Sequence, residues 1–199
     1  MIPKTDIAEV KAELRKRIRA ERRAIPGEER RAAALLTAER LMEMPELKNC
    51  EYVLGYMPMK YELDVLPALE GLKKLGATPV FPLCIDEGGL RLFVPAEENG
   101  FVTGAYGILE PDIRTAREIE AEDLGAIILP AIGFDRQGHR LGQGGGYYDR
   151  LLARCSCFTV AVGFDCQLVE SVPTEGTDRP VRAIVTPSGV IRPQTQYFV

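Results

Sequence analysis

A glycine-rich segment between an apolar run and a helical pattern constrains the fold of this chain more than any other feature. The apolar run covers 126–129 and stops at Pro130, and helical spacing resumes at Tyr147. The segment between them contains Gly138, Gly142, Gly144, Gly145 and Gly146. This order is typical of phosphate binding, because loop N–H groups converge there and the helix N-terminus adds partial positive charge. Glycine permits the positive φ angles and the close approach of a ligand.

The two best-known phosphate-binding loops do not match this segment. The chain contains no GxxxxGK[ST], and a dinucleotide fingerprint beginning at Gly142 would need a third glycine where Tyr147 stands. The pattern alone therefore leaves two interpretations open. The loop is either an ordinary turn or a phosphate-binding loop of another architecture.

Composition indicates an ordinary globular protein. Its 199 residues are 46% hydrophobic and 27% charged, which predicts a single domain over 1–199 with a sizeable core. The net charge of −4 does not favour a nucleic-acid partner. No apolar run reaches the ~18–20 residues of a membrane span, and the charged N-terminus does not resemble a signal peptide. We expect a cytoplasmic monomer with a small-molecule substrate and no membrane partner.

Cysteine and histidine usage argues against a zinc site. The five cysteines stand at 50, 84, 155, 157 and 166, with no CxxC spacing, and His139 is the single histidine. Reduced, mostly buried thiols are the expected state.

The first helix is expected to begin after Asp6. Apolar residues Ile7, Val10, Leu14 and Ile18 recur at helical spacing, while Lys11, Arg15, Arg19 and Arg22 share another face. A basic face is most often solvated, and an anion-binding face is the alternative.

Further helices are expected at 28–44, at 64–76 with Asp64 as N-cap, and at 146–154. Strands are expected at 52–57, 78–84, 90–94, 126–129, 158–164 and 183–186. Pro79 and Pro82 predict that 78–84 is an edge or bulged strand. The stretch 97–122 has no clear period and is expected to be a loop. Alternating strands and helices predict a three-layer α/β/α domain with a mainly parallel sheet.

The spelling of the central segment resembles a known family. LPAIGFDRQGHRLGQGGGYYDRLL (129–152) is similar to the central motif of the 5-formyltetrahydrofolate cyclo-ligase (methenyltetrahydrofolate synthetase) family, F-D-x-x-G-x-R-L-G-x-G-x-G-Y-Y-D. Four further segments resemble the family in order: 11–15, 56–64, 106–111 and 163–178. The chain departs from the family pattern at two positions, where Thr177 replaces a histidine and Arg182 replaces an aspartate.

The resemblance implies conversion of 5-formyltetrahydrofolate to 5,10-methenyltetrahydrofolate with ATP and Mg²⁺, through a phosphorylated formyl (iminol phosphate) intermediate. It implies catalytic roles for Arg140 and Tyr148 and metal ligands at Asp149 and Asp178. The implied ATP-binding residues are Lys11, Arg15, Arg140, Leu141, Gly142, Gln143, Gly144, Gly145, Gly146, Tyr147 and Tyr148. The implied folate-binding residues are Met57, Glu62, Tyr106, Gly144, Gly145, Gly146 and Tyr147. No protein general base is expected, because N10 of the folate is itself the nucleophile.

Several alternatives stay open at this level. By pattern alone Glu62 is more often a solvated loop residue. Tyr106 is as readily an aromatic that pins its loop to the core, and Asp149 with Arg150 could form a surface ion pair. Two other functions also fit the residues. One is a paralogue that acts on another ATP-activated amide or formamide, and the other is a non-catalytic nucleotide- or folate-binding protein.

Overall fold

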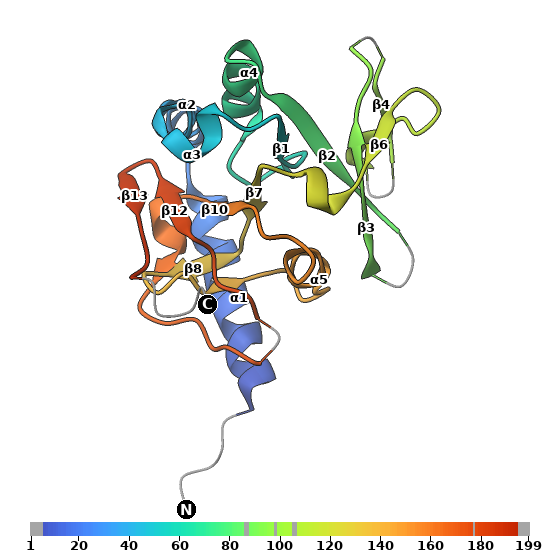
Figure 1. Ribbon diagram of the computed structural model, residues 1–199. Helices are drawn as coiled ribbons and strands as arrows, with labels where there is room; N and C mark the ends of the chain where they lie inside the picture. The colour runs from blue at the N-terminus through green and yellow to red at the C-terminus, as the bar shows by residue number, and fades with distance from the viewer. Residues whose placement is uncertain (1–5, 86–87, 98, 105–106, 177, 195–199) are drawn as a thin grey trace, which may run out of the picture.

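The computed structural model describes residues 6–85, 88–97, 99–104, 107–176 and 178–194, which form a mixed α/β domain around a large sheet (Figure 1). The strands of this sheet lie in the order β13-β12-β10-β7-β1-β2-β3-β6. They are β1 (Tyr52–Leu54), β2 (Thr78–Cys84), β3 (Leu90–Val94), β6 (Arg117–Ile119), β7 (Ala126–Pro130), β10 (Phe158–Val162), β12 (Ala183–Thr186) and β13 (Gly189–Ile191).

The pairs β1–β2, β1–β7, β7–β10 and β10–β12 are parallel, whereas β2–β3, β3–β6 and β12–β13 are antiparallel. The predicted α/β fold with a mainly parallel sheet is confirmed.

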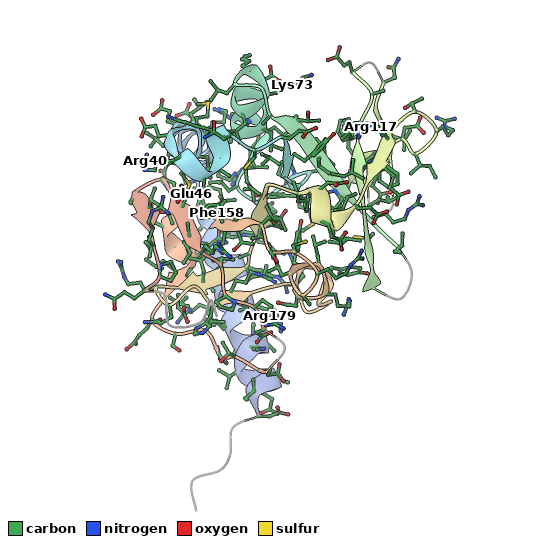
Figure 2. The ribbon with its side chains drawn as sticks, viewed as in Figure 1. Arg40, Glu46, Lys73, Arg117, Phe158 and Arg179 are labelled. Carbon is green, nitrogen blue, oxygen red and sulfur yellow. The ribbon has the colours of Figure 1, made fainter. Side chains whose placement is uncertain are left out.

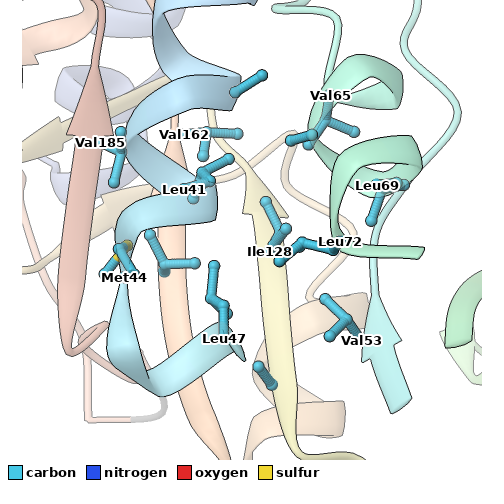
Figure 3. Close-up of a cluster of buried hydrophobic side chains, with 14 of the residues drawn as sticks. Leu41, Met44, Leu47, Val53, Val65, Leu69, Leu72, Ile128, Val162 and Val185 are labelled. Carbon is cyan, nitrogen blue, oxygen red and sulfur yellow. The ribbon is translucent and has the colours of Figure 1, made fainter. Parts of the chain in front are cut away.

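Helices cover both faces of the sheet. On one face lie α2 (Gly27–Glu43), α3 (Pro45–Lys48) and α4 (Leu66–Lys74), whose apolar side chains meet Ile128 and Val162 in the cluster of Figure 3. On the other face lie α5 (Tyr147–Leu152) and the short η3 (Ala121–Asp123), which pack with Ile127 and Leu129. Because β7 is buried on both sides, its sequence is a continuous apolar run rather than an alternation.

The long helix α1 (Ile7–Ala24) packs against a second, three-stranded sheet. This sheet has the order β11-β8-β9, with β8 (Gly133–Asp135), β9 (Arg140–Leu141) and β11 (Leu168–Val169). Ile18 of α1 is completely buried there, and a Cβ atom on Gly133 would lie 2.6 Å from its Cδ1 atom. Glycine at the start of β8 therefore lets the helix approach the strand, and α1 lies directly beside the glycine-rich segment.

The helix caps agree in part with the sequence. The Asp6 carboxylate accepts the Ala8 N–H at 3.0 Å, as expected of an N-cap. Asp64, in contrast, lies one residue before the cap position of α4, which Val65 occupies, although its carboxylate still accepts the Leu66 N–H at 2.9 Å. Within the described parts of the chain, no helix combines the length and apolar character that crossing a membrane requires.

The expectation that 78–84 is an edge or bulged strand is wrong, because β2 lies inside the sheet between β1 and β3 and its register with each neighbour is unbroken. Its two proline nitrogens both point to places where the neighbouring strand is absent. The Thr78 N–H donates toward β1. Because successive backbone nitrogens of a strand point to opposite sides, the Pro79 nitrogen points to the β3 side. The pairing with β3 does not extend past Phe81, so no β3 carbonyl lies opposite Pro79. Pro82 faces the β1 side, where that strand has already ended. Each proline therefore lies where β2 has no paired neighbour on that side, so a strand inside the sheet tolerates both of them.

The stretch 97–122 is not a plain loop. It contains β4 (Phe101–Thr103) paired with β5 (Leu109–Pro111), then β6 and η3. Strands of three residues are too short to show a period of two, which is why the pattern missed them. The sheet also continues past 183–186, because β13 adds an antiparallel edge strand.

Candidate active site

A cavity of about 720 Å³ lies at the carboxyl ends of the central strands, where open α/β sheets bind ligands. Residues at the ends of β7 and β2 form its floor. Its walls come from α1, the glycine-rich loop, α5, and the residues Glu175, Gly176, Asp178 and Arg179. The sequence-predicted residues that line it are Lys11, Arg15, Glu62, Arg140, Gly142, Gln143, Gly144, Gly145, Gly146, Tyr147, Tyr148, Asp149 and Asp178. The tertiary structure therefore brings most of the candidate residues to one place.

Two residues of the basic face of α1, Lys11 and Arg15, line this cavity. Lys11 and Arg22 are only 8% and 6% exposed, whereas Ile7 and Val10 of the expected apolar stripe are 43% and 37% exposed. Arg15 donates from Nε to the Gly142 carbonyl at 2.9 Å. The interpretation of this face as a solvated charge run is therefore wrong.

The glycine-rich loop needs its glycines at the turn into α5. Gly144 has φ +108° and Gly146 has φ +67°, both in the region that favours glycine. Arg150 of α5 donates to the Gly88 carbonyl at 2.7 Å and also to the Gly145 carbonyl. These contacts hold the loop open toward the cavity and tie it to the β2–β3 connection. Arg150 therefore bonds to these two carbonyl groups and not to Asp149, with which the sequence suggested a surface ion pair.

Arg140 and Asp149 form the buried ion pair of the site. Arg140 Nη2 donates to Asp149 Oδ1 at 2.6 Å. The Arg140 side chain is 4% exposed, and this burial lowers the pKa of its guanidinium. Its Nε finds no hydrogen-bond partner among the described residues, and its guanidinium lies 6.0 Å from the Tyr148 ring. Burial raises the pKa of Tyr148, so this phenol stays protonated at neutral pH and is able to donate a hydrogen bond.

Lys11 joins two carboxylates on the opposite wall. Its Nζ lies 2.8 Å from Glu175 Oε2 and 2.9 Å from Asp178 Oδ2. Burial works against the lysine charge, but the two hydrogen bonds outweigh it and raise the Lys11 pKa. Burial likewise opposes ionisation of Asp178, yet the hydrogen bonds from Lys11 and from the Glu175 N–H lower its pKa.

The two aspartates fit a hard metal ion. Asp149 and Asp178 both line the cavity beside the glycine-rich loop, and their oxygen atoms suit Mg²⁺, which commonly takes one or two carboxylates together with substrate phosphates. Among the described residues, no group of three or more His, Cys, Asp or Glu side chains is placed to hold a metal ion.

Glu62 lies at the other end of the cavity, between β1 and α4. Its carboxylate accepts the Met59 N–H at 3.1 Å and a hydrogen bond from the Gln143 side chain. Burial raises its pKa in spite of these donors and of the nearby Arg22 charge. The interpretation of Glu62 as a solvated loop residue is therefore wrong, and the site presents a partly desolvated acceptor.

Some candidates lie elsewhere. The Leu141 side chain is 1% exposed and belongs to the core that α1 and β8 share, and Met57 packs against the α2–α4 core. Arg182 precedes β12 and donates from its backbone N–H to the Thr159 carbonyl at 3.0 Å, so this departure is not on the cavity wall. Tyr106 and Thr177 lie outside the described residues.

The sequence did not identify two charged wall residues. Glu175 pairs with Lys11, and Arg179 lies on the cavity rim near α1 (Figure 2). Their position in sequence, on either side of Asp178, was the available signal. An apolar wall of Pro82, Cys84 and Leu90 was also missed, because its residues come from β2 and β3 and carry no local motif.

Asp135 of the central motif supports the loop from behind. It is 1% exposed, and its Oδ1 accepts the backbone N–H groups of Gln137 and His139, each at 3.0 Å. Its Oδ2 accepts the Val172 N–H at 2.9 Å and lies 3.0 Å from His139 Nδ1. This carboxylate thus ties the β8–β9 turn to the segment before Glu175.

Comparison with known proteins agrees over nearly the whole chain. A family model described as the 5-formyltetrahydrofolate cyclo-ligase family matches residues 7–187. The 5-formyltetrahydrofolate cyclo-ligase of Escherichia coli K12 is 34% identical over 178 residues, covering 87% of this chain and 98% of that protein. The mouse protein of the same name is 27% identical over 188 residues, covering 88% and 91%.

A solved structure of the 5,10-methenyltetrahydrofolate synthetase from Aquifex aeolicus is 32% identical to this chain, covers 96% of each chain and superposes with a TM-score of 0.83. The synthetase from Mycoplasma pneumoniae is 22% identical with a TM-score of 0.72, covering 89% of this chain and 98% of that chain, which bears on the fold alone.

Proposed function

Since the chain belongs to the 5-formyltetrahydrofolate cyclo-ligase family, we propose that it converts 5-formyltetrahydrofolate to 5,10-methenyltetrahydrofolate and uses ATP to do so. The formyl oxygen attacks the γ-phosphorus of ATP, the bond to ADP breaks, and an iminol phosphate forms on the folate. N10 of the folate then attacks the activated carbon, the carbon–oxygen bond breaks, N10 loses its proton and phosphate departs. The overall reaction releases ADP and phosphate.

One observation carries this proposal: a single cavity joins a cationic, glycine-lined end to a partly desolvated carboxylate. A phosphoryl transfer depends on neutralising charge and on placing donor and acceptor in line, more than on covalent help from the protein. The cations come from Lys11, Arg15 and Arg140, and the backbone donors come from the glycine-rich loop. Glu62 is the acceptor for the N–H groups of the pterin ring.

The remaining roles follow from position. Arg140, buried beside Asp149, neutralises charge on the transferring phosphoryl group, and the protonated Tyr148 phenol donates to the formyl oxygen or to the phosphate. Asp149 and Asp178 are the residues that would hold Mg²⁺, which supplies charge neutralisation at the phosphates. We further propose that the whole chain, 1–199, acts as one domain and as a cytoplasmic monomer.

The test is a spectrophotometric assay of the whole chain. The protein is mixed with 5-formyltetrahydrofolate and MgATP, and absorbance is followed at the methenyl-folate band, with a matched reaction that lacks ATP. An ATP-dependent rise is expected. A flat trace with ATP binding intact by calorimetry would instead favour a paralogue that acts on another amide, and folate binding without turnover would favour a non-catalytic binder.

A further inference from the structure

Gln143 of the glycine-rich loop contacts a charged side chain on each side, Arg19 of α1 and Glu62. Arg19 Nη2 donates to the Gln143 Oε1 atom at 2.6 Å. A guanidinium has only donors, so the Gln143 atom that faces it must be the amide oxygen. The amide NH₂ group then points the other way, and the Glu62 carboxylate accepts a hydrogen bond from this side chain. The result is a relay that runs from Arg19 through Gln143 to Glu62.

The relay is anchored on both sides. Arg15 and Arg19 lie one turn apart on α1, and Arg15 holds the Gly142 carbonyl at 2.9 Å, one residue before Gln143. Gly144, the next residue, has φ +108° and sets the direction of the loop. The loop is therefore clamped to α1 once by its backbone and once by the Gln143 side chain.

Both ends of the relay are charged, which strengthens its hydrogen bonds. A cation donates to the amide oxygen, and the amide hydrogens donate to a carboxylate, so each bond polarises the other. The Glu62 carboxylate also accepts the Met59 N–H at 3.1 Å. A carboxylate has about four acceptor sites, so the Gln143 amide adds a second direction from which the Glu62 carboxylate is held.

We propose that Gln143 is a positioning residue that orients Glu62 for the folate ring and couples folate binding to the nucleotide loop. The inference rests on the proposed function, because it takes Glu62 as the folate acceptor and 142–146 as the nucleotide loop. A nucleotide that orders the loop would hold Gln143, and with it Glu62, in the orientation that receives the folate. ATP and folate should therefore each tighten the binding of the other.

The test compares Gln143→Met, which keeps the length of the side chain and removes both amide functions, with wild type. The KM for 5-formyltetrahydrofolate should rise about tenfold, as expected for one lost hydrogen bond to a charged group, and by more than the KM for ATP rises. Arg17→Met is the matched control, because the Arg17 side chain is 60% exposed, lies off the cavity wall and pairs with Glu21 at 3.7 Å.

Two further measurements separate positioning from simple loss of structure. In a Glu62→Ala background, Gln143→Met should change folate affinity by less than about twofold, because its target is already gone. Calorimetry should also show that a non-hydrolysable ATP analogue tightens folate binding in wild type but not in Gln143→Met. Melting temperature provides the check that each variant is folded.

The outcomes distinguish this inference from the proposed function. An inactive wild-type protein that binds no folate would overturn the proposed function itself. An active wild type with an unchanged folate KM in Gln143→Met would overturn only the role of Gln143. A tenfold loss that persists in the Glu62→Ala background, or a rise in the KM for ATP alone, would also overturn it.

Discussion

The two ends of the cavity hold their charges in opposite ways. At the glycine-rich end, Lys11 and Arg140 already lie against carboxylates at 2.6–2.9 Å. At the other end, Glu62 has hydrogen-bond donors, but no cation lies within ion-pair distance of it among the described residues. A phosphate that enters the first end must exchange partners with ion pairs that already exist. A pterin ring that enters the Glu62 end supplies N–H donors to a carboxylate that has no ion-pair partner within the described chain.

This difference sets the expected size of each effect. Breaking a partly buried ion pair leaves an uncompensated charge, which costs more than the pair itself contributes. Removing a carboxylate that waits for a ligand costs little stability and mainly lowers affinity. Variants at the first end should therefore affect turnover and folding together, and variants at the second end should affect folate binding.

The largest effect is expected from Asp149→Asn. This change keeps the shape of the side chain but removes the charge that faces Arg140, so the group proposed to hold Mg²⁺ is lost. We expect kcat to fall by on the order of 10²-fold or more, comparable to removing one electrostatic stabiliser of a transition state. Folate affinity by calorimetry should stay within about threefold.

Asp165→Asn is the control for this variant, because the Asp165 carboxylate accepts the Ser188 N–H at 3.3 Å and lies off the cavity wall. An equal loss of turnover and of folate affinity in Asp149→Asn would refute the metal role.

Glu62→Ala should give the next largest effect. The variant loses the acceptor for the pterin N–H groups, and hydrogen bonds to a charged group contribute about 1.5–3 kcal/mol each. We expect the folate KM to rise about 10- to 100-fold with little change in the KM for ATP. Steady-state kinetics measure both. Glu118→Ala, at an exposed pair with Arg91, should leave both unchanged, and an unaltered folate KM in Glu62→Ala would remove Glu62 from the folate site.

Gly144→Ala tests the loop that joins the two ends. Alanine has room there, with the nearest atom of Arg15 at 3.7 Å from the added Cβ, but it must adopt φ +108°. The strain should cost about 1–2 kcal/mol, which lowers the melting temperature by about 2–8 °C in a chain of this length. Gly189→Ala is the matched control, since its Cβ meets nothing within 4 Å and its φ is not positive. Equal melting temperatures for the two variants would show that the loop is not held in this conformation.

The smallest effect concerns pH. Burial raises the Glu62 pKa, and the ring N–H groups need the ionised carboxylate, so folate affinity should fall as pH drops through this raised pKa. Below it, each pH unit should cost up to about tenfold in affinity. The groups that face Glu62 are Arg22 from α1, Tyr56 beyond β1 and Tyr148 from α5. Folate titrations from pH 4 to pH 8 measure the curve. Glu62→Gln should flatten it, and an acid limb that survives in that variant would belong to another group.

The central segment shows how much of the site a local sequence pattern predicts. Its strand, glycine turn and helix are neighbours in sequence, so the resemblance of this one motif to the family placed Arg140, Gly144 and Asp149 together. Helix α1 shows the opposite case. Both of its stripes were visible, but which residues of each stripe are buried depends on segments far along the chain, and the structure buries Ile18 of the apolar stripe together with Lys11 and Arg22 of the basic one. The strands within 97–122 were missed because their pairing is with each other and with β3.

The sequence by itself determined the fold class, the family, and the local chemistry of the glycine-rich loop, because hydrophobic period, turn residues and motif spelling are properties of neighbouring residues. Only the tertiary structure decided the pairing of Lys11 with Glu175 and Asp178, the interior place of β2, and the relay from Arg19 to Glu62. Each of these joins segments far apart in the chain. Their contacts depend on how α1 crosses the loop and on where each strand ends, which no local pattern encodes.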